Sequence, residues 1–349
     1  MTRVVEDAGF RPPAWLRNRH LQTILPSLPP LRSFAIARAR ALSERAEEWL
    51  LDCGEGTRLQ GWYTAPPAPA AAVEPPRVVG RLALLLHGWE GSAASAYVLS
   101  LAAELLGRGF HIVRLNLRDH GDTHHLNPGL FHSCRLPEVI GAVRAIAARA
   151  QPRRLYGAGF SLGGNFLLRV AASGEAPASL AGVAAVSPVL EPARTLDAME
   201  SGIPFYERYF VRKWLKSLQH KERHWPDRYD IDATLRERTL RGMTAALVDR
   251  HTDYPTLEHY LSGYAITGTR LATLTVPARL LTSADDPIIP AGDLARLADS
   301  PLLSVVRTRY GRIGRAGQTT QKEHDSEDRA ATEYERLVIE KTRKGYEER

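Results

Sequence analysis

The chain has 349 residues, of which 44% are hydrophobic and 24% charged, a balance typical of a soluble globular protein. Its net charge is +7, but the basic residues are scattered singly, and this argues against a nucleic-acid-binding patch. The two cysteines, Cys53 and Cys134, are too few for a disulfide framework and favour a reducing, cytoplasmic setting.

The N-terminus lacks the apolar core of a secretory signal, and the apolar run LALLLHGW is too short to span a bilayer. We therefore expect no integral membrane segment.

From residue 45 onward the chain predicts alternating strands and helices. Two strands joined by the turn CGEGTR come first, followed by the Pro/Ala-rich loop 64–77. RLALLLHG is a continuous apolar run of strand length, as in a strand buried on both faces of a parallel sheet. The predicted strands are 45–52, 59–65, 81–88, 111–118, 153–160 and 180–188, and the predicted helices are 95–109, 136–150 and 162–173.

The alternation stops between about Leu190 and Gly268, where aromatic and charged residues form plausible helices without a buried strand. It resumes with strand 276–286, helix 291–299 and strand 302–310. We expect one α/β domain over residues 1–349, with a mostly parallel, doubly wound sheet and a helical cap inserted at 190–268. The final residues, 315–349, form a polar, highly charged tail.

The stretch GFSLGGN, residues 159–165, contains a G-x-S-x-G motif between a predicted strand and a predicted helix. Glycines beside Ser161 permit a sharp strand-to-helix turn that exposes the serine at the carboxyl end of the sheet. The free N–H groups of the following helix favour negative charge on an attacked carbonyl oxygen. Ser161 is therefore the predicted nucleophile, and the alternative is a small residue in a glycine-rich turn.

His87 and Gly88 directly follow a buried strand, where a second oxyanion donor is expected. We assign the oxyanion hole to the backbone N–H groups of Trp89 and Leu162. For the His87 side chain we favour a structural role, with its ring hydrogen-bonded to the backbone of its own loop.

The acid is predicted in SADDP, where two aspartates follow an apolar strand. A carboxylate there can orient an imidazole and stabilise its cation. The spacing favours Asp286, with Asp285 as second choice and an Asp-Pro turn as the structural alternative.

The base should follow the last strand, but no histidine stands beside it. Beyond Asp286 the only histidine is His324, in an acid-flanked stretch typical of a solvated surface.

With these motifs the chain resembles the YheT-like subfamily of α/β-hydrolases, related to eukaryotic α/β-hydrolase-domain lipases, over residues 10 to about 310. FRPPAWLRNRHLQTI resembles the N-terminal signature of the subfamily, with Asn18, His20, Gln22 and Thr23 in step. LLLHGWEGS, RLNLRDHGDT with GLFHS, GFSLGGN and SADDP resemble the later segments. The resemblance implies an esterase or lipase that needs no cofactor and no metal, with Ser161 and Asp286 in a Ser-Asp-His triad.

The chain departs from this subfamily at Arg312, where YGRIGRAG stands in place of a Gly-Gly-His-x-Gly-Phe loop. Either the base has been lost by divergence, or a shifted reading frame has replaced the native end, so that 315–349 would be non-native.

The function expected from these residues is hydrolysis of small-molecule carboxylic esters, of short to medium acyl chain or lipid, through an acyl-enzyme. Two alternatives are an inactive scaffold that binds an acyl ligand or a partner protein, and a nucleic-acid binder. The cap aromatics, Phe205, Tyr206, Tyr209, Phe210 and Trp214, either line an apolar pocket or simply pack the cap onto the sheet. Oligomeric state and acyl chain length are not readable from the sequence.

Overall fold

The computed structural model describes residues 2–7, 18–29, 31–67, 79–229 and 231–308. Most of the predicted Pro/Ala-rich loop and the whole tail 315–349, including His324, lie outside these residues.

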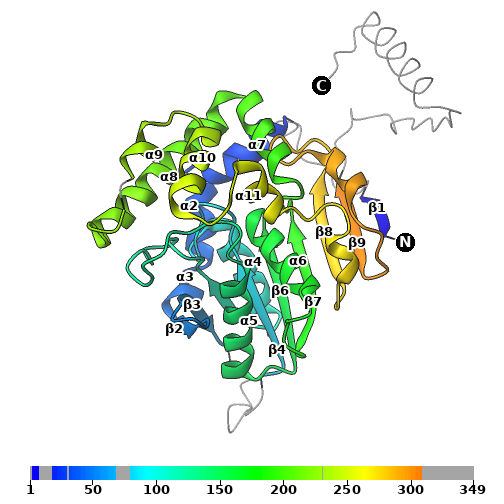
Figure 1. Cartoon of the computed structure of the whole chain (residues 1–349). Coiled ribbons are helices and arrows are strands. Elements are labelled where there is room, and N and C mark those ends of the chain that lie inside the picture. The colour runs from blue at the N-terminus through cyan, green and yellow to red at the C-terminus, as the bar shows by residue number, and fades with distance from the viewer. Residues whose placement is uncertain (1, 8–17, 30, 68–78, 230, 309–349) are drawn as a thin grey trace, which may run out of the picture. The chain divides into compact units, whose positions relative to one another are not determined.

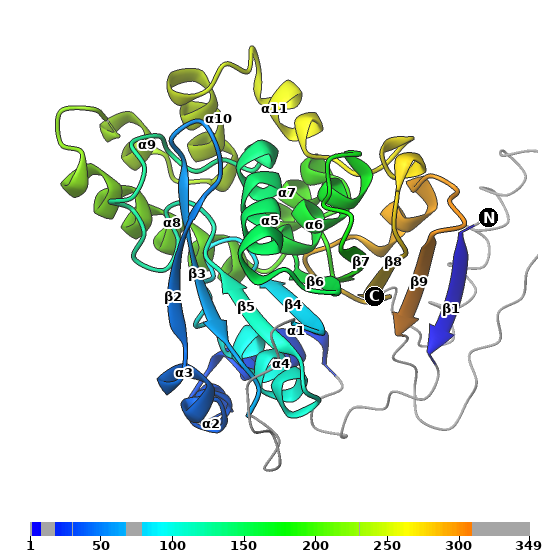
Figure 2. The ribbon, with the colours of Figure 1, turned by 90° about the horizontal axis from the view of Figure 1, so that it is seen from below.

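A nine-stranded mixed sheet forms the centre, in the order β1-β9-β8-β7-β6-β4-β5-β3-β2. All neighbouring strands are parallel except β3, which is antiparallel to both β5 and β2. The predicted α/β class with a mostly parallel sheet is confirmed (Figures 1 and 2). The strands are β1 (Arg3–Asp7), β2 (Glu47–Asp52), β3 (Arg58–Thr64), β4 (Arg81–Leu86), β5 (His111–Leu115), β6 (Arg154–Phe160), β7 (Leu180–Val186), β8 (Ala278–Ser283) and β9 (Leu303–Thr308).

Helices cover both faces of this sheet. Helices α5 (Leu136–Ala150) and α6 (Leu162–Ala172) lie on one face, and α4 (Ala96–Gly107) lies on the other (Figure 2). Strand β4 shows why its sequence is uniformly apolar. Leu82, Leu84 and Leu86 pack into the core under α5 and α6, and the alternate residues, Ala83 and Leu85, pack into the core under α4.

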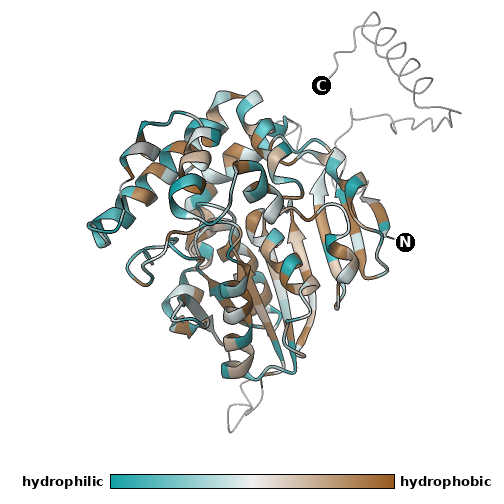
Figure 3. Cartoon of the chain, in the orientation of Figure 1, coloured by the Kyte–Doolittle hydropathy of each residue, from teal (hydrophilic) through white to brown (hydrophobic). Residues whose placement is uncertain are grey.

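Every regular element between β7 and β8 is a helix, and this segment contains residues 190–268, the predicted cap. Its helices are α7 (Pro192–Ser201), α8 (Pro204–His224), α9 (Asp232–Arg236), α10 (Leu240–His251), α11 (Leu257–Gly263) and η3 (Arg270–Thr273). Trp214, Leu218, Met243 and Leu247 form part of a separate apolar cluster, which also includes Leu130 of the loop after β5. Figure 3 shows hydrophobic residues concentrated in the central strands and many hydrophilic ones over the cap helices.

Two N-terminal features were not predicted. β1 pairs in parallel with β9 and extends the sheet by one edge strand. Four short helices then precede β2, namely α1 (Arg19–Ile24), η2 (Leu25–Ser27), α2 (Leu31–Arg38) and α3 (Arg40–Glu44).

The helix predicted at 291–299 is instead the 3-10 helix η4 (Ala291–Arg296). Asp293 in this turn is fully buried, and its Oδ1 atom lies 2.5 Å from Nε of Arg194 in α7. A regular amphipathic helix would face its apolar side toward the core, whereas this segment buries the Asp293 carboxylate. The segment is therefore a tight turn that is held to the cap by the Asp293–Arg194 ion pair.

Candidate active site

Ser161 occupies the sharp turn that the motif predicts, between β6 and α6. It is the N-cap residue of α6 and has φ 49° and ψ −119°, a conformation that costs energy in a non-glycine residue. Its backbone is fixed on both sides, since its N–H donates to the Val186 carbonyl at 2.9 Å and its carbonyl accepts from the Asn165 N–H at 3.0 Å. Such enforced strain at a serine that remains partly accessible is characteristic of a functional turn.

Both glycines of the motif are required by close backbone contacts. A Cβ on Gly159 would collide with the Gly163 carbonyl, and a Cβ on Gly163 would collide with the backbone of Leu86 and His87. The motif therefore lets α6 start directly against the ends of β6 and β4, and this places Ser161 above the sheet.

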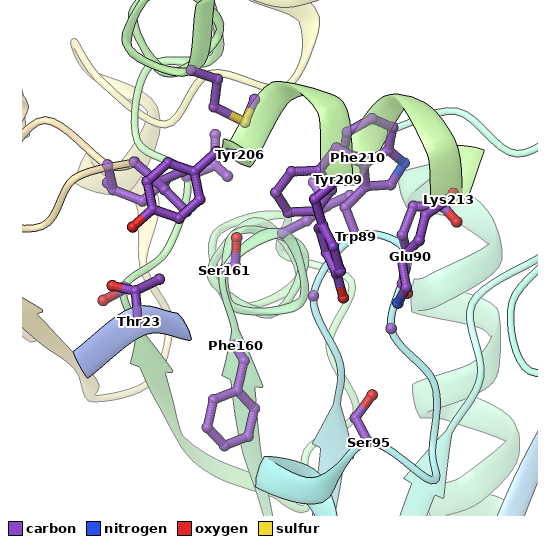
Figure 4. A pocket seen from close by; sticks show the side chains of 18 of the residues that line it. Thr23, Trp89, Glu90, Ser95, Phe160, Ser161, Tyr206, Tyr209, Phe210 and Lys213 are labelled. Atoms are coloured by element: carbon purple, nitrogen blue, oxygen red, sulfur yellow. The ribbon is translucent and has the colours of Figure 1, made fainter. Parts of the chain in front are cut away.

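The Ser161 hydroxyl points toward the cap, while Phe160 points the opposite way (Figure 4). It opens into a pocket of about 1290 Å³ between the carboxyl ends of the strands and the cap helices. All five cap aromatics line this pocket, and Trp89 stacks on Phe210 with ring centroids 5.3 Å apart. The cap aromatics thus both line a pocket and hold the cap against the Trp89 loop.

The loop after β4 lies directly against the serine. A Cβ on Gly88 would sit 3.2 Å from Cβ of Ser161, and both Trp89 and Leu162 line the pocket. Within the described part of the chain, the N–H groups of Trp89 and Leu162 donate to no other protein group. Two free amide donors beside a serine are the components of an oxyanion hole.

The structural role predicted for His87 is confirmed. Its ring is fully buried, with Nδ1 2.7 Å from the Gly88 carbonyl and Nε2 accepting from the Leu117 N–H at 3.1 Å. Burial lowers the pKa of His87 to about 3, so the ring is neutral and fixes the loop.

Asp286 lies beyond the end of β8, one strand removed from β6. Strand β7 pairs Val186 with both Phe160, the last residue of β6, and Leu281 of β8. Because β8 ends at Ser283, it runs two residues further than β6 toward the carboxyl edge of the sheet. The Oδ1 atom of Asp286 accepts the N–H groups of Ile288 and Ile289 at 2.9 and 3.0 Å. Asp285 is occupied differently, since its Oδ1 accepts the Ser283 hydroxyl.

No histidine among the described residues hydrogen-bonds to Asp286. The charge of Asp286 instead acts on Tyr206, whose pKa is raised first by burial and then by this carboxylate. The Tyr206 hydroxyl lies 3.0 Å from Nδ1 of His20. Tyr206 lines the same pocket as Ser161, whereas Asp286 and His20 are not among the residues that line it.

The contact of Tyr206 with His20 involves the described end of the N-terminal signature. The Asn18 side chain caps α1 by accepting the N–H groups of His20 and Leu21, and Thr23 lines the pocket. Residues 18–24 of the signature thus form a capped helix beside the pocket, and residues 10–17 lie outside the described part of the chain.

Three pocket residues were missed by sequence reasoning. Burial raises the pKa of the Glu90 carboxyl group to about 7, and the nearby Lys213 ammonium opposes this rise. Lys213 also donates a hydrogen bond to the backbone carbonyl of Glu90 at 2.6 Å (Figure 4). His132 is the only described histidine that lines the pocket, and burial lowers its pKa to about 3. The positive φ of Glu90, 56°, appears only in three dimensions, so nothing in the sequence distinguished this residue.

No helix in the described part of the chain is both long enough and apolar enough to cross a membrane.

Comparison with known proteins identifies two segments. A family model described as the alpha/beta hydrolase family matches residues 83–313. A model described as the WGR domain matches residues 300–349, which include the polar tail.

Two curated proteins are similar over most of the chain. The embryogenesis-associated protein EMB8 of Picea glauca is 22% identical over 86% of this chain and 66% of its own length. The protein abhd-3.2 of Caenorhabditis elegans is 23% identical over 66% of this chain and 60% of its own length. The chain therefore spans less than two thirds of either relative.

Among solved structures, puromycin hydrolase superposes with a TM-score of 0.50 and 16% identity, over 76% of this chain and 35% of that protein. At this identity the likeness supports the fold alone.

Proposed function

Because the chain belongs to the alpha/beta hydrolase family, we propose that it is a serine hydrolase that cleaves carboxylic esters, and that it falls in the YheT-like subfamily. Its substrates in this proposal are short- to medium-chain acyl esters or lipids. The observation that carries the proposal is the strained Ser161 turn, whose hydroxyl opens into a large pocket beside two free amide donors.

In the proposed reaction, Oγ of Ser161 attacks the ester carbonyl carbon and its proton passes to a base. The N–H groups of Trp89 and Leu162 stabilise the oxyanion. The alcohol leaves with a proton, an acyl-serine remains, and water then releases the acid. Asp286 orients the base and stabilises its cation, and its position after β8, separated from β6 only by β7, supports this role.

The base is the weak component of this constellation. His87 and His120 are committed to backbone groups, and burial lowers the pKa of His132, the only described histidine that lines the pocket, to about 3. The family loop that would carry a histidine is replaced after β9. Loss of the base from such a triad lowers the rate by about 10⁴-fold or more. We infer that Ser161 is correctly placed but weakly activated.

We further propose that residues 315–349 are a native segment of the WGR type rather than an out-of-frame end. The match to a WGR family model over 300–349 supports this, because a shifted frame does not ordinarily yield a recognisable family sequence. Sequencing the gene across codons 305–320 in related strains tests it, and an interrupted frame there would contradict it.

A second candidate function is an inactive scaffold that binds an acyl ligand in the same pocket. The absence of a histidine hydrogen-bonded to Asp286 within the described residues favours it. The two functions share a ligand class and differ only in turnover.

An esterase screen separates them. Esters of p-nitrophenol with increasing acyl length are compared on this chain and on a variant carrying the family's Gly-Gly-His-x-Gly-Phe loop from residue 311. We expect slow turnover by the chain and at least a 100-fold gain with the loop, both lost in Ser161→Ala. Ser100→Ala, an exposed serine of the same pocket, is the matched control.

Turnover that survives in Ser161→Ala would reject the nucleophile. Absence of turnover in both proteins, with fatty-acid binding retained, would favour the scaffold.

A further inference from the structure

Four histidines gather where α8 ends, outside the pocket. His220 and His224 lie one turn apart on α8, and His124 and His125 lie on the loop that follows β5. The ring centroids of His124 and His220 are 4.4 Å apart, those of His220 and His224 4.9 Å, and those of His125 and His224 5.7 Å. The esterase reaction uses none of them.

The two helix histidines face each other through their Nε2 atoms, which are 3.2 Å apart. Zinc binds imidazole nitrogen at about 2.0–2.1 Å in a tetrahedral arrangement, so two ligand nitrogens on one ion stand roughly 3.3 Å apart. Histidines at positions i and i+4 of a helix are also the spacing with which metalloprotease helices hold zinc. The pair therefore already has the separation that a metal ion requires.

The cluster is open to solvent at two of its four histidines. His125 and His224 are exposed, so an ion can reach the pair from solvent.

We propose that His220 and His224 bind one first-row divalent transition-metal ion, for which Zn²⁺ is the probe, and that His125 rotates to supply a third ligand. Imidazole ligands suit zinc, copper and nickel rather than calcium or magnesium. Across the described residues, no three His, Cys, Asp or Glu side chains already form a metal site, so the rotation of His125 is part of the proposal.

His124 is the fixed member of the cluster. Its ring is buried, and its Nε2 lies 2.8 Å from the Ser217 hydroxyl. It therefore holds the loop against α8, and this keeps the exposed His125 ring beside His224. A bound ion would tie the loop after β5 to the cap helix.

The competing explanation is a plain N–H···N hydrogen bond between His220 and His224. A hydrogen-bonded pair and a chelating pair have the same separation, so they are distinguished only by adding metal.

The test is equilibrium dialysis and titration calorimetry of the chelator-treated full chain with Zn²⁺, and visible spectroscopy with Co²⁺. We expect one equivalent of Zn²⁺ per chain, and an affinity weakened roughly tenfold or more in His224→Ala and in His125→Ala. His259→Ala is the matched control. His259 is exposed, like His125 and His224, but it lies in the first turn of α11 and its Nδ1 contacts the Thr256 hydroxyl. It should bind as the unchanged chain does.

Two results would overturn the proposal. One is no saturable Zn²⁺ binding to the chain. The other is binding that His224→Ala leaves unchanged, which would assign the ion elsewhere. His224→Cys guards against a folding artefact, because a thiolate also binds zinc and should restore affinity if the site is real.

Discussion

The Nζ atom of Lys221 lies 2.7 Å from Oδ1 of Asp119, and both side chains are almost completely buried. Lys221 belongs to cap helix α8, whereas Asp119 belongs to the loop that follows β5. Nζ also donates to the carbonyls of His124 and Asn127, and the other Asp119 oxygen accepts the Phe131 N–H. The Lys221 ammonium therefore links the cap to the loop after β5, and each of its three N–H donors has an acceptor.

Removing this lysine should strongly destabilise the protein. Lys221→Ala leaves the Asp119 carboxylate buried without its cation, which typically costs about 3–5 kcal/mol. Urea unfolding measures the free energy. Arg108→Ala, which breaks an exposed ion pair with Glu104 on α4, should cost less than about 1 kcal/mol. Equal losses of unfolding free energy in the two variants would show that burial of the ion pair does not determine its contribution to stability.

Two glycine-to-alanine changes should act in opposite directions. Gly163→Ala forces a Cβ into the backbone of Leu86 and His87, so we expect a loss of about 1–3 kcal/mol or more. Gly107→Ala at the end of α4 meets open space and should gain roughly 0.5–1 kcal/mol. Thermal and urea unfolding of both variants decide the matter. A Gly163→Ala protein as stable as the parent would contradict the close approach of α6 to β4.

Glu90 should make stability depend on pH between about 4.5 and 7. Its pKa in the folded chain is raised from 4.5 to about 7, so the folded state holds a proton that the unfolded state has already lost. The resulting stabilisation is complete below the unfolded pKa and is lost as the pH rises through about 7. Urea unfolding from pH 4 to 8 should show a smaller decline for Glu90→Gln than for the parent. The exposed Glu44→Gln should follow the parent, and an unchanged decline in Glu90→Gln would reject this origin.

Strands and core were predictable where one local rule governs the structure. The apolar run at β4 and the glycine-flanked Ser161 predicted a doubly buried strand and a strand-to-helix turn, because both signals lie within a few residues. β1 and η4 were not predicted as such. β1 is a strand only because β9 offers it an edge, and η4 is tight because Asp293 reaches Arg194 about a hundred residues away.

The site shows the same limit. Ser161 and Asp286 carry their own sequence signals, and the sheet order places both at the carboxyl edge of the sheet, with β7 between their strands. The contact of His20 with Tyr206 joins positions 186 residues apart, and the raised pKa of Glu90 comes from burial under the cap. Neither has a local pattern, so only the assembled fold reveals them.

The choice between the two aspartates can be tested in the variant that carries the family histidine loop. Asp286 follows β8 at the same carboxyl edge of the sheet as Ser161, and its Oδ1 is held by two backbone N–H groups, which leaves Oδ2 for an imidazole. Asp286→Asn should therefore lower kcat by about 10⁴-fold, since an amide orients the wrong imidazole tautomer. Asp285→Asn is the matched control, because that carboxylate accepts the Ser283 hydroxyl, and it should change kcat less than about tenfold. Steady-state rates on a p-nitrophenyl ester, with circular dichroism to verify folding, give the comparison. If Asp285→Asn proves the damaging change, the acid is the earlier residue, and the Asp286 side chain then serves only to hold the turn at Ile288 and Ile289.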